Sequence, residues 1–274
     1  MLMVFPQTES SAYTMNDEPN HELMHPAENA SAWSESYYFN FIDPKSGVGM
    51  FTRMGFRPGD GWADGLHVIY LPGKQVAFTY GRRDIGSDLS EYDGDLQAGD
   101  LTLTLIEPHK KWRIDYKGPA QDIVDAAVLL ERKKLRPQGW YKDARLVMSL
   151  NFDCLTEPHF TSSEDGRTGA FGHFEQSGRV YGQIQLDNQT FQVDGFGVRD
   201  KSWGPRDWGA SQRKTGGEER VSSFSSADAP NPFVNWFSMN FGAEIAMGGS
   251  CFRQPSGVIK GAGWIQRDGK SMDL

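Results

Sequence analysis

The sequence has little cysteine, no long apolar run and no concentrated positive charge. Its two cysteines, Cys154 and Cys251, lie far apart in the chain, so they form no disulfide framework of the kind that holds small secreted domains together. Residues 1–13 lack the basic cluster and apolar stretch of a secretory signal, and no segment is apolar for long enough to span a membrane as a helix. We therefore expect a cytoplasmic location, two free thiols and no membrane span.

An excess of positive charge is also absent. The formal net charge is −8 and the sequence pI is about 5.3, whereas nucleic-acid binding needs clustered Lys and Arg to release counterions from phosphates. Short basic runs at 131–136 and 213–214 are interpreted as solvated faces. The charge balance excludes nucleic acid as a partner and favours a small, uncharged or weakly charged ligand. It leaves open whether the chain forms a homo-oligomer.

Several motifs of known chemistry are missing as well. The six histidines and two cysteines show no zinc signature. The opening Gly195-Phe-Gly197 of a dinucleotide fingerprint lacks the later glycine and the helix that would follow it, and no Gly-x-Ser-x-Gly nucleophile elbow occurs. His173 and Glu175 would share one face of a strand, where a hydrogen-bonded pair is far more common than a metal site. We expect no cofactor and no metal.

What the sequence does contain is a series of short strands. Glycine (31 residues) and aromatic residues (8 Trp, 17 Phe and 9 Tyr) are both abundant, which is typical of closed β architectures with bending strands and ring-filled interiors. Leu101–Leu105 alternates apolar and polar residues, as a half-buried strand does. Turn residues at 43–47 and 72–74 predict hairpins. The fold class is expected to be all-β, with a short helix or tight excursion near 121–134, where apolar residues follow a helical spacing.

Polar segments predict how the chain is divided. Residues 1–28 are polar and unpatterned, and are expected to form an N-terminal arm outside the core. The polar stretch 156–169 indicates a boundary between a first β domain at 29–160 and a second at 161–274. Because the chain stops soon after a strand-like segment, the second domain is expected to be open or to be completed by a partner.

The densest group of unusual residues runs from Asp194 to Trp208 and is too polar for a core strand and too aromatic for an ordinary loop. Its glycines at 195 and 197 predict a β-bulge. A bulge re-aims the side chains around it, so alternation along the strand does not assign Asp200 and Trp203 to a face.

Three stretches of the sequence resemble a known family. They are ESYYFNFIDP (35–44), HFEQSGRVYG (173–182) and GFGVRDKSWGPRDW (195–208). From about residue 33 to its C-terminus the chain resembles bacterial AttH-like proteins, which have two lipocalin-like β domains and are related to carotenoid 1,2-hydratases (hydroxyneurosporene synthases). The hydratase pattern Asp-His-x-Trp-Gly reads Asp200-Lys201-Ser202-Trp203-Gly204 here. The lysine cannot act as the missing histidine at neutral pH unless burial lowers its pKa by several units.

The resemblance implies two lipocalin-like β-barrel or sandwich domains, an apolar cavity, and an acid that protonates an unactivated alkene. An Asp stays protonated at neutral pH only in apolar surroundings, and tryptophan rings attract the resulting carbocation. The expected reaction is hydration, isomerisation or cyclisation of an apolar, unsaturated small molecule. The candidate catalytic residues are Asp200 and Asp207, and the candidate ligand-binding residues are Trp203, Trp208, Trp236, Arg199, Lys201 and Tyr38.

Other interpretations stay open. Arg199, Asp200, Arg206 and Asp207 would equally form a structural ion-pair network that pins one β unit against the other. A lipocalin-type protein that binds a hydrophobic molecule without chemistry needs the cavity but no ionisable residue inside it. A partner-docking scaffold needs neither, because its aromatic residues would only fill cores.

Overall fold

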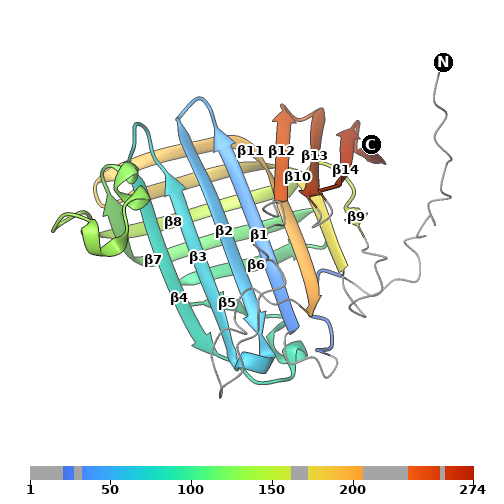
Figure 1. Ribbon diagram of the computed structural model, residues 1–274, viewed down its shortest axis with the longest axis horizontal. Coiled ribbons are helices and arrows are strands. Elements are labelled where there is room, and N and C mark those ends of the chain that lie inside the picture. Colours follow the sequence, from blue (N-terminus) through green and yellow to red (C-terminus); the bar gives the residue numbers. More distant parts are fainter. Residues whose placement is uncertain (1–20, 28–32, 162–171, 206–233, 254–256) are drawn as a thin grey trace.

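The computed structural model describes residues 21–27, 33–161, 172–205, 234–253 and 257–274. In these residues the regular structure is antiparallel β-strand with a few short 3₁₀ helices, which confirms the all-β prediction (Figure 1). The strands are β1 (Trp33–Asp43), β2 (Val48–Arg57), β3 (Trp62–Tyr70), β4 (Val76–Asp84), β5 (Leu96–Ala98), β6 (Leu101–Glu107), β7 (Lys111–Ile123), β8 (Lys142–Cys154), β9 (His159–Thr161), β10 (Gly172–Leu186), β11 (Gln189–Pro205), β12 (Val234–Phe241), β13 (Ile245–Arg253), β14 (Ile259–Arg267) and β15 (Lys270–Asp273). The 3₁₀ helices are η1 (Pro58–Asp60), η2 (Leu89–Tyr92), η3 (Ala126–Leu130) and η4 (Lys133–Leu135).

Strands β1 to β11 form one sheet that closes on itself. Its order is β4-β3-β2-β1-β11-β10-β8-β7-β6-β5, β9 pairs with β10, and the end of β7 pairs with the start of β4. Closure of a sheet into a lipocalin-like barrel removes its free edges. The sheet runs across the predicted domain boundary at residue 160, because β10 and β11 pair with β8 and β1. The division into domains stays a prediction.

The predicted hairpins are confirmed. Between β1 and β2, the Asp43 carboxylate accepts hydrogen bonds from the backbone nitrogens of Lys45 (2.9 Å) and Ser46 (3.3 Å). Gly47 ends this turn at φ 71°, a conformation that costs glycine little. In the turn between β3 and β4, Gly73 likewise has a positive φ, 82°, which glycine adopts at little cost.

The barrel interior is a packed core. Leu101 and Leu103 of β6 are buried, as their alternation predicts. Large rings from several strands fill the same space, and burial of each contributes about 1.5–3 kcal/mol relative to exposure. The fully buried rings are those of Tyr37, Phe39, Phe41, Phe56, Trp112, Phe152 and Phe174.

A second sheet packs against the outside of the barrel. It has the order β12-β13-β14-β15 and stands beside β1, β10 and β11 (Figure 1). Ala246 of β13 and Trp264 of β14 are buried against Val198 of β11, and Tyr38 and Trp236 pack at the edge of this cluster. The junction of the two sheets is therefore a small apolar core of its own.

The bulge predicted at Gly195 and Gly197 is wrong. Both glycines stay in continuous register with β10, opposite Val180 and Gly178. They are needed instead for a close approach between β11 and β1, because a Cβ at Gly197 would overlap the carbonyl of Asn40. The Asn40 side chain accepts the hydrogen bond from the backbone nitrogen of Val198 at 3.0 Å.

Of the short helix or tight excursion expected near 121–134, the structure has the tight excursion and no α-helix. Gln121–Ile123 still belong to β7, and only η3 and η4 follow, as a tight excursion of 3₁₀ turns. Ile123 is buried whereas Leu129 and Leu130 are exposed. The apolar residues at helical spacing therefore do not share a buried face, and nothing stabilises an α-helix there.

The expected exclusion of residues 1–28 from the core is wrong for the part that the structure describes. Met24 belongs to the barrel core, and Glu22 is 1% exposed. The phenol of Tyr37 donates a hydrogen bond to the backbone oxygen of Glu22 at 2.9 Å. Polar contacts rather than an apolar pattern hold this segment, so its composition did not reveal its burial.

Candidate functional site

Strand β11 presents two different chemistries on its two faces. Side chains alternate between the faces of a strand, and the unbroken register of β11 with β10 carries this alternation from Val198 to Trp203. Arg199, Lys201 and Trp203 point into the barrel and are buried. Val198 and Asp200 point to the outer side of the barrel, where Val198 packs against the second sheet and Asp200 lies 3.7 Å from His173.

Two ion pairs lie inside the barrel. The guanidinium of Arg199 donates to both oxygens of Glu22, at 2.6 and 3.0 Å. The ammonium of Lys201 donates to Glu35 at 2.5 Å and to the backbone oxygen of Leu23 at 2.6 Å. The side chains of both pairs are at most 1% exposed. Removal of one partner from such a pair strongly destabilises the fold, because the charge of the other partner is left buried without a counter-charge or water.

The bonds from Arg199 to Glu22 and from Lys201 to the backbone oxygen of Leu23 hold residues 21–27 against the barrel. The His25 ring stacks on Trp203, with ring centroids 4.1 Å apart, and its Nδ1 lies 2.8 Å from Glu35. Burial lowers the pKa of His25, although Glu35 opposes this effect. Burial raises the pKa of Glu22, but the charge and hydrogen bonds of Arg199 outweigh it and hold the pKa below its usual value.

A second group of ionisable residues lies outside the barrel, where the two sheets meet. His173 and Glu175 share the outer face of β10, and Glu175 lies opposite Asp200 in register. His173 contacts both carboxylates, through Nε2 to Glu175 at 3.0 Å and through Nδ1 to Asp200 at 3.7 Å. The hydrogen-bonded pair expected from the spacing of His173 and Glu175 is thus confirmed.

Glu175 joins this group to the second sheet. Its carboxylate accepts hydrogen bonds from the indole nitrogens of Trp236, at 2.6 Å, and of Trp264. Burial raises the pKa of Glu175, but His173 and the two indoles together lower it by more. The net pKa is below the usual value, so the carboxylate stays ionised. Charge-assisted hydrogen bonds of this kind are about twice as strong as neutral ones.

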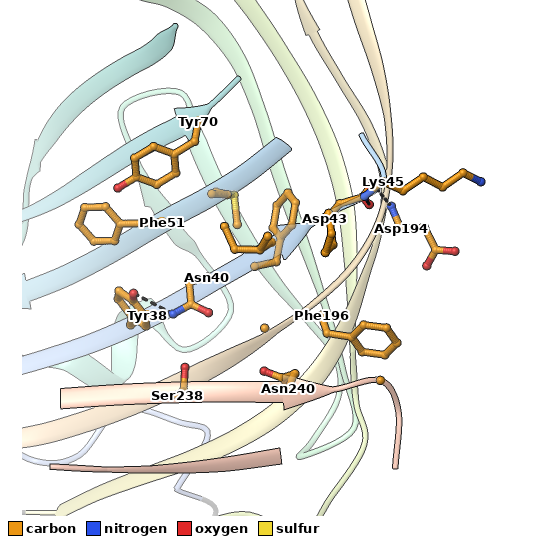
Figure 2. A pocket seen from close by; sticks show the side chains of 16 residues that line it. Tyr38, Asn40, Asp43, Lys45, Phe51, Tyr70, Asp194, Phe196, Ser238 and Asn240 are labelled. Atoms are coloured by element: carbon orange, nitrogen blue, oxygen red, sulfur yellow. Dashed lines mark hydrogen bonds between the residues drawn. The ribbon is translucent and has the colours of Figure 1, made fainter. Parts of the chain in front are cut away.

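A groove of about 720 Å³ opens beside this group, between the outer face of the barrel and β12. Figure 2 shows Tyr38 and Asn40 of β1 above Ser238 and Asn240 of β12 across the groove. Both aromatic and polar side chains line the groove, and the polar ones are those of Asn40, Asp43, Lys45, Asp194, Ser238 and Asn240. The rings on this outer side of the barrel are those of Tyr38, Phe51, Tyr70 and Phe196, whereas the ring of Phe41 lies in the barrel core. This combination is typical of small-molecule sites.

Tyr38 connects the groove to the ionisable group. It lies opposite Asp200 on β11 and opposite Arg53 on β2, and its ring packs edge-on against Trp236 at 5.8 Å. Burial raises the pKa of the Tyr38 phenol, the hydrogen bond from Asn40 opposes this, and the charge of Asp200 raises it further. The phenol is therefore neutral and able to donate a proton or a hydrogen bond.

The comparison with protein families identifies the group to which the chain belongs. Residues 18–274 match the model of a family described as a domain of unknown function, DUF7064. The chain is a member of the DUF7064 family. No curated protein matches its sequence.

Solved structures resemble this DUF7064 chain in fold. The crystal structure of a Nitrosomonas europaea protein described as an AttH has 12% sequence identity to this chain and a TM-score of 0.55. The match covers 99% of this chain and 75% of that one. CghA has 13% identity and a TM-score of 0.41, over 88% and 59% of the two chains. Kievitone hydratase from Nectria haematococca has 8% identity and a TM-score of 0.45, over 92% and 68%. The first of these likenesses supports the AttH-like, lipocalin-like fold.

Of the residues proposed from sequence, the DUF7064 structure brings together Asp200, Tyr38 and Trp236. Trp203 and Asp200 are apart, because their side chains lie on opposite faces of β11. Arg199 and Lys201 form ion pairs inside the barrel. Burial does lower the pKa of Lys201, although Glu35 opposes it. The ammonium nevertheless faces the core rather than the groove. Asp207 and Trp208 lie outside the described residues.

Sequence reasoning missed Glu175 as the centre of the outer group and Trp264 as its partner. The signal was present for Glu175, since it pairs with His173 within a stretch that resembles the family. Nothing in the sequence linked either residue to Trp264, which is 89 positions from Glu175 along the chain. Within the described ranges, no cluster of three or more His, Cys, Asp or Glu could hold a metal ion. The same ranges contain no helix of the length and apolarity that crossing a membrane requires.

Proposed function

We propose that this protein binds an apolar, unsaturated small molecule in the groove between the barrel and β12, and transforms it by acid–base catalysis. The observation that supports this most is the position of Tyr38. Its ring is part of the groove wall, and its register partner is the half-buried carboxylate of Asp200. An apolar binding surface and a proton-transfer pair thus share one residue.

The contacts of Asp200 favour a chemistry that differs in detail from direct protonation of an alkene. Asp200 lies 3.7 Å from His173, and in this proposal its carboxylate acts first as a base. The neutral Tyr38 phenol donates a hydrogen bond to an oxygen of the ligand. In an isomerisation, Asp200 removes a proton beside a carbonyl, Tyr38 stabilises the oxyanion, and Asp200 returns the proton to another carbon. No oxidant or reductant is required.

The other parts of the sequence-based hypothesis remain within this proposal. Hydration and cyclisation use the same pair of groups, with water or a second double bond as the reacting partner. The ring of Trp236, which packs against Tyr38, would attract a developing cation. Asp207 and Trp208 are kept as candidates that follow β11 in the chain. The relationship to carotenoid 1,2-hydratases is likewise part of this proposal. A cytoplasmic location is kept because it agrees with the free thiols of Cys154 and Cys251.

The ligand is tested by capture. Purified protein is incubated with an organic extract of cells and re-isolated, and the retained molecules are identified by mass spectrometry. A variant with Ser238→Trp, which fills the groove from β12, is the control. We expect apolar molecules to be retained by the wild type and lost from the variant. Equal retention by both proteins would place binding elsewhere.

Catalysis is tested with the captured molecule. Tyr38→Phe and Asp200→Asn keep the shape of the groove and remove the acid and the base, so turnover should fall by about 100-fold or more while retention of the ligand persists. Tyr70→Phe, which removes another phenol from the same groove, is the matched control and should stay within about twofold. Because Asp200 is partly exposed, Asp200→Asn should cost less than about 1 kcal/mol of stability.

A second function is favoured by the bonds of Glu175. The path from Asp200 through His173 and Glu175 to Trp236 and Trp264 fastens the second sheet to the barrel, which is the structural role also expected for charges in this region. A binding protein without chemistry would then use the groove alone. It would retain the molecule unchanged, and Tyr38→Phe would alter affinity without altering any product.

A further inference from the structure

The segment between β7 and β8, residues 124–141, is apolar and basic at once and projects from one end of the barrel (Figure 1). We propose that this 124–141 loop binds the surface of an anionic lipid bilayer. The proposal goes beyond the proposed function, since it concerns where the protein works and not what the groove does.

Large apolar side chains of the loop face water. Leu130 is 89% exposed, Val124 67%, Leu135 61% and Leu129 41%. Single exposed apolar residues are normal on a protein surface, but four within twelve positions concentrate apolar surface in one loop, as interaction sites do. Tyr141 is exposed in the same loop and Trp140 is half-buried. Tyrosine and tryptophan are enriched where proteins meet the headgroups of a bilayer.

The charge of the loop is opposite to that of the protein. Arg132, Lys133, Lys134 and Arg136 stand against the acidic residues Asp125 and Glu131, whereas the whole chain has a net charge of −8. Arg132, Lys133 and Lys134 are exposed and form no ion pair with any residue that the structure describes. Each basic residue close to an anionic membrane strengthens binding by about fivefold. The remaining negative charge of the chain is repelled, so that the loop is the part turned towards the bilayer.

The loop is held in shape before it meets a membrane. Arg136 donates hydrogen bonds to the backbone oxygens of Glu131 (3.1 Å) and Leu129 (3.3 Å), and its guanidinium lies 4.7 Å from the centre of the Trp140 ring. Asp125 caps η3 by accepting a hydrogen bond from the backbone nitrogen of Ala127 at 3.0 Å. The exposed leucines are thus presented by a built structure, which lowers the entropic cost of binding.

The loop also lies at the end of the barrel where the groove opens. The backbone nitrogen of Ala126 donates to the oxygen of Lys74 at 2.9 Å, in the turn that follows β3, and Tyr70 at the end of β3 lines the groove. A protein seated on the bilayer by this loop has its groove mouth near the lipid, where apolar molecules collect. Only this last step rests on the proposed function.

The test measures co-sedimentation with vesicles and needs no substrate. The full chain is mixed with vesicles of phosphatidylcholine alone, or with about 30% phosphatidylserine, at low and high salt. We expect binding to the anionic vesicles only, and its loss as ionic strength rises towards 1 M, because salt screens exposed charges. Absence of binding to the anionic vesicles would overturn the proposal.

Variants locate the binding surface. Lys133→Glu with Lys134→Glu should weaken binding by about 25-fold or more, and Leu130→Ser with Leu135→Ser by about tenfold or more. The matched control is Ile106→Ser with Lys110→Glu, which changes an exposed apolar and an exposed basic residue at the opposite end of β7. All variants are first checked for an unchanged melting temperature.

Two further outcomes count against the proposal. If the control weakens binding as much as the loop variants do, the attraction is not specific to the loop. If lipid binding is absent but the leucine variant alters the oligomeric state in size-exclusion chromatography, the loop is a protein interface. Neither outcome depends on whether the groove is catalytic.

Discussion

Trp264 of the second sheet donates the hydrogen of its indole nitrogen to the carboxylate of Glu175 in the barrel wall. The indole of Trp236 donates to the other carboxylate oxygen, so one buried charge receives a bond from each of two strands of the second sheet. The attachment of this sheet to the barrel therefore depends on an acceptor that must be ionised to satisfy both indoles and His173.

Glu175→Gln should loosen that attachment. A glutamine offers one neutral carbonyl oxygen where the carboxylate offers two, and its amide nitrogen would face an indole donor. We expect a loss of about 2–3 kcal/mol, seen as a fall in melting temperature of about 4–10 °C and a red shift of tryptophan fluorescence. Glu107→Gln, on the exposed β6–β7 hairpin, should leave both measurements unchanged. An unaltered melt for Glu175→Gln would mean that the apolar contacts of Trp264 alone hold the sheet.

The pair of Lys201 and Glu35 should behave as one unit. Lys201→Met leaves the Glu35 carboxylate in the core without its ammonium, and should cost about 3–5 kcal/mol. Adding Glu35→Leu removes the stranded charge and should restore at least half of that loss, because an apolar pair of similar volume suits a buried site. Chemical denaturation of the two single variants and the double variant measures this coupling. Additive effects would show that the two side chains act independently.

Stability should fall as the solution becomes acidic, and His67 should contribute to the slope. This histidine is fully buried in the barrel beside Thr52, and burial lowers its pKa to about 3. Between about pH 6.5 and pH 3 the unfolded chain binds a proton at this site that the folded chain does not. The free energy of unfolding then falls by about 1.4 kcal/mol for each unit of pH.

The measurement for His67 is denaturation of the wild type and of His67→Gln between about pH 7.5 and pH 5. Glutamine keeps a hydrogen-bonding group next to Thr52 but does not titrate. The difference in stability between the two proteins should shift in favour of the variant as the pH falls. A constant difference across this range would show that His67 does not control the acid response.

Cys154 should be far less reactive than an ordinary thiol. Burial raises its pKa to about 11, and at pH 8 this reduces the thiolate about 100-fold relative to the usual thiol pKa near 9. We expect a Cys251→Ser protein, which keeps only Cys154, to react slowly with a thiol reagent, and a Cys154→Ser protein to react faster. In denaturant without reductant the wild type should show two free thiols. Rapid modification of native Cys154 would contradict the burial argument.

The extent to which sequence anticipated structure depended on whether contacts were local. The hairpin at Asp43–Gly47 and the pairing of His173 with Glu175 follow from a few adjacent residues, and both were predicted. The face of Asp200 could not be predicted, because the glycines at 195 and 197 suggested a bulge where the structure has a close approach to Asn40. Only the position of the neighbouring strand distinguishes these two uses of glycine.

Long-range polar contacts were the main omission. Glu22 lies in a segment without any apolar pattern, and its burial follows from Arg199, 177 positions later in the chain. Similarly, the apolar residues at 126–130 follow a helical spacing, but the barrel provides no surface for them to cover. A sequence pattern shows which face of a segment is apolar, not whether anything packs against it.

The pairing of β1 with β11 sets a condition on how this chain is made. A ribosome that adds about 5–20 residues per second needs roughly 10–30 s to extend the chain from the end of β1 to the end of β11. Throughout that interval one edge of β1 has hydrogen-bonding groups and aromatic side chains but no neighbouring strand, which is the state in which nascent β proteins associate with each other. We therefore expect the chain to be most prone to association before β11 has been synthesised, and recombinant expression at lower temperature and translation rate should then increase the soluble yield.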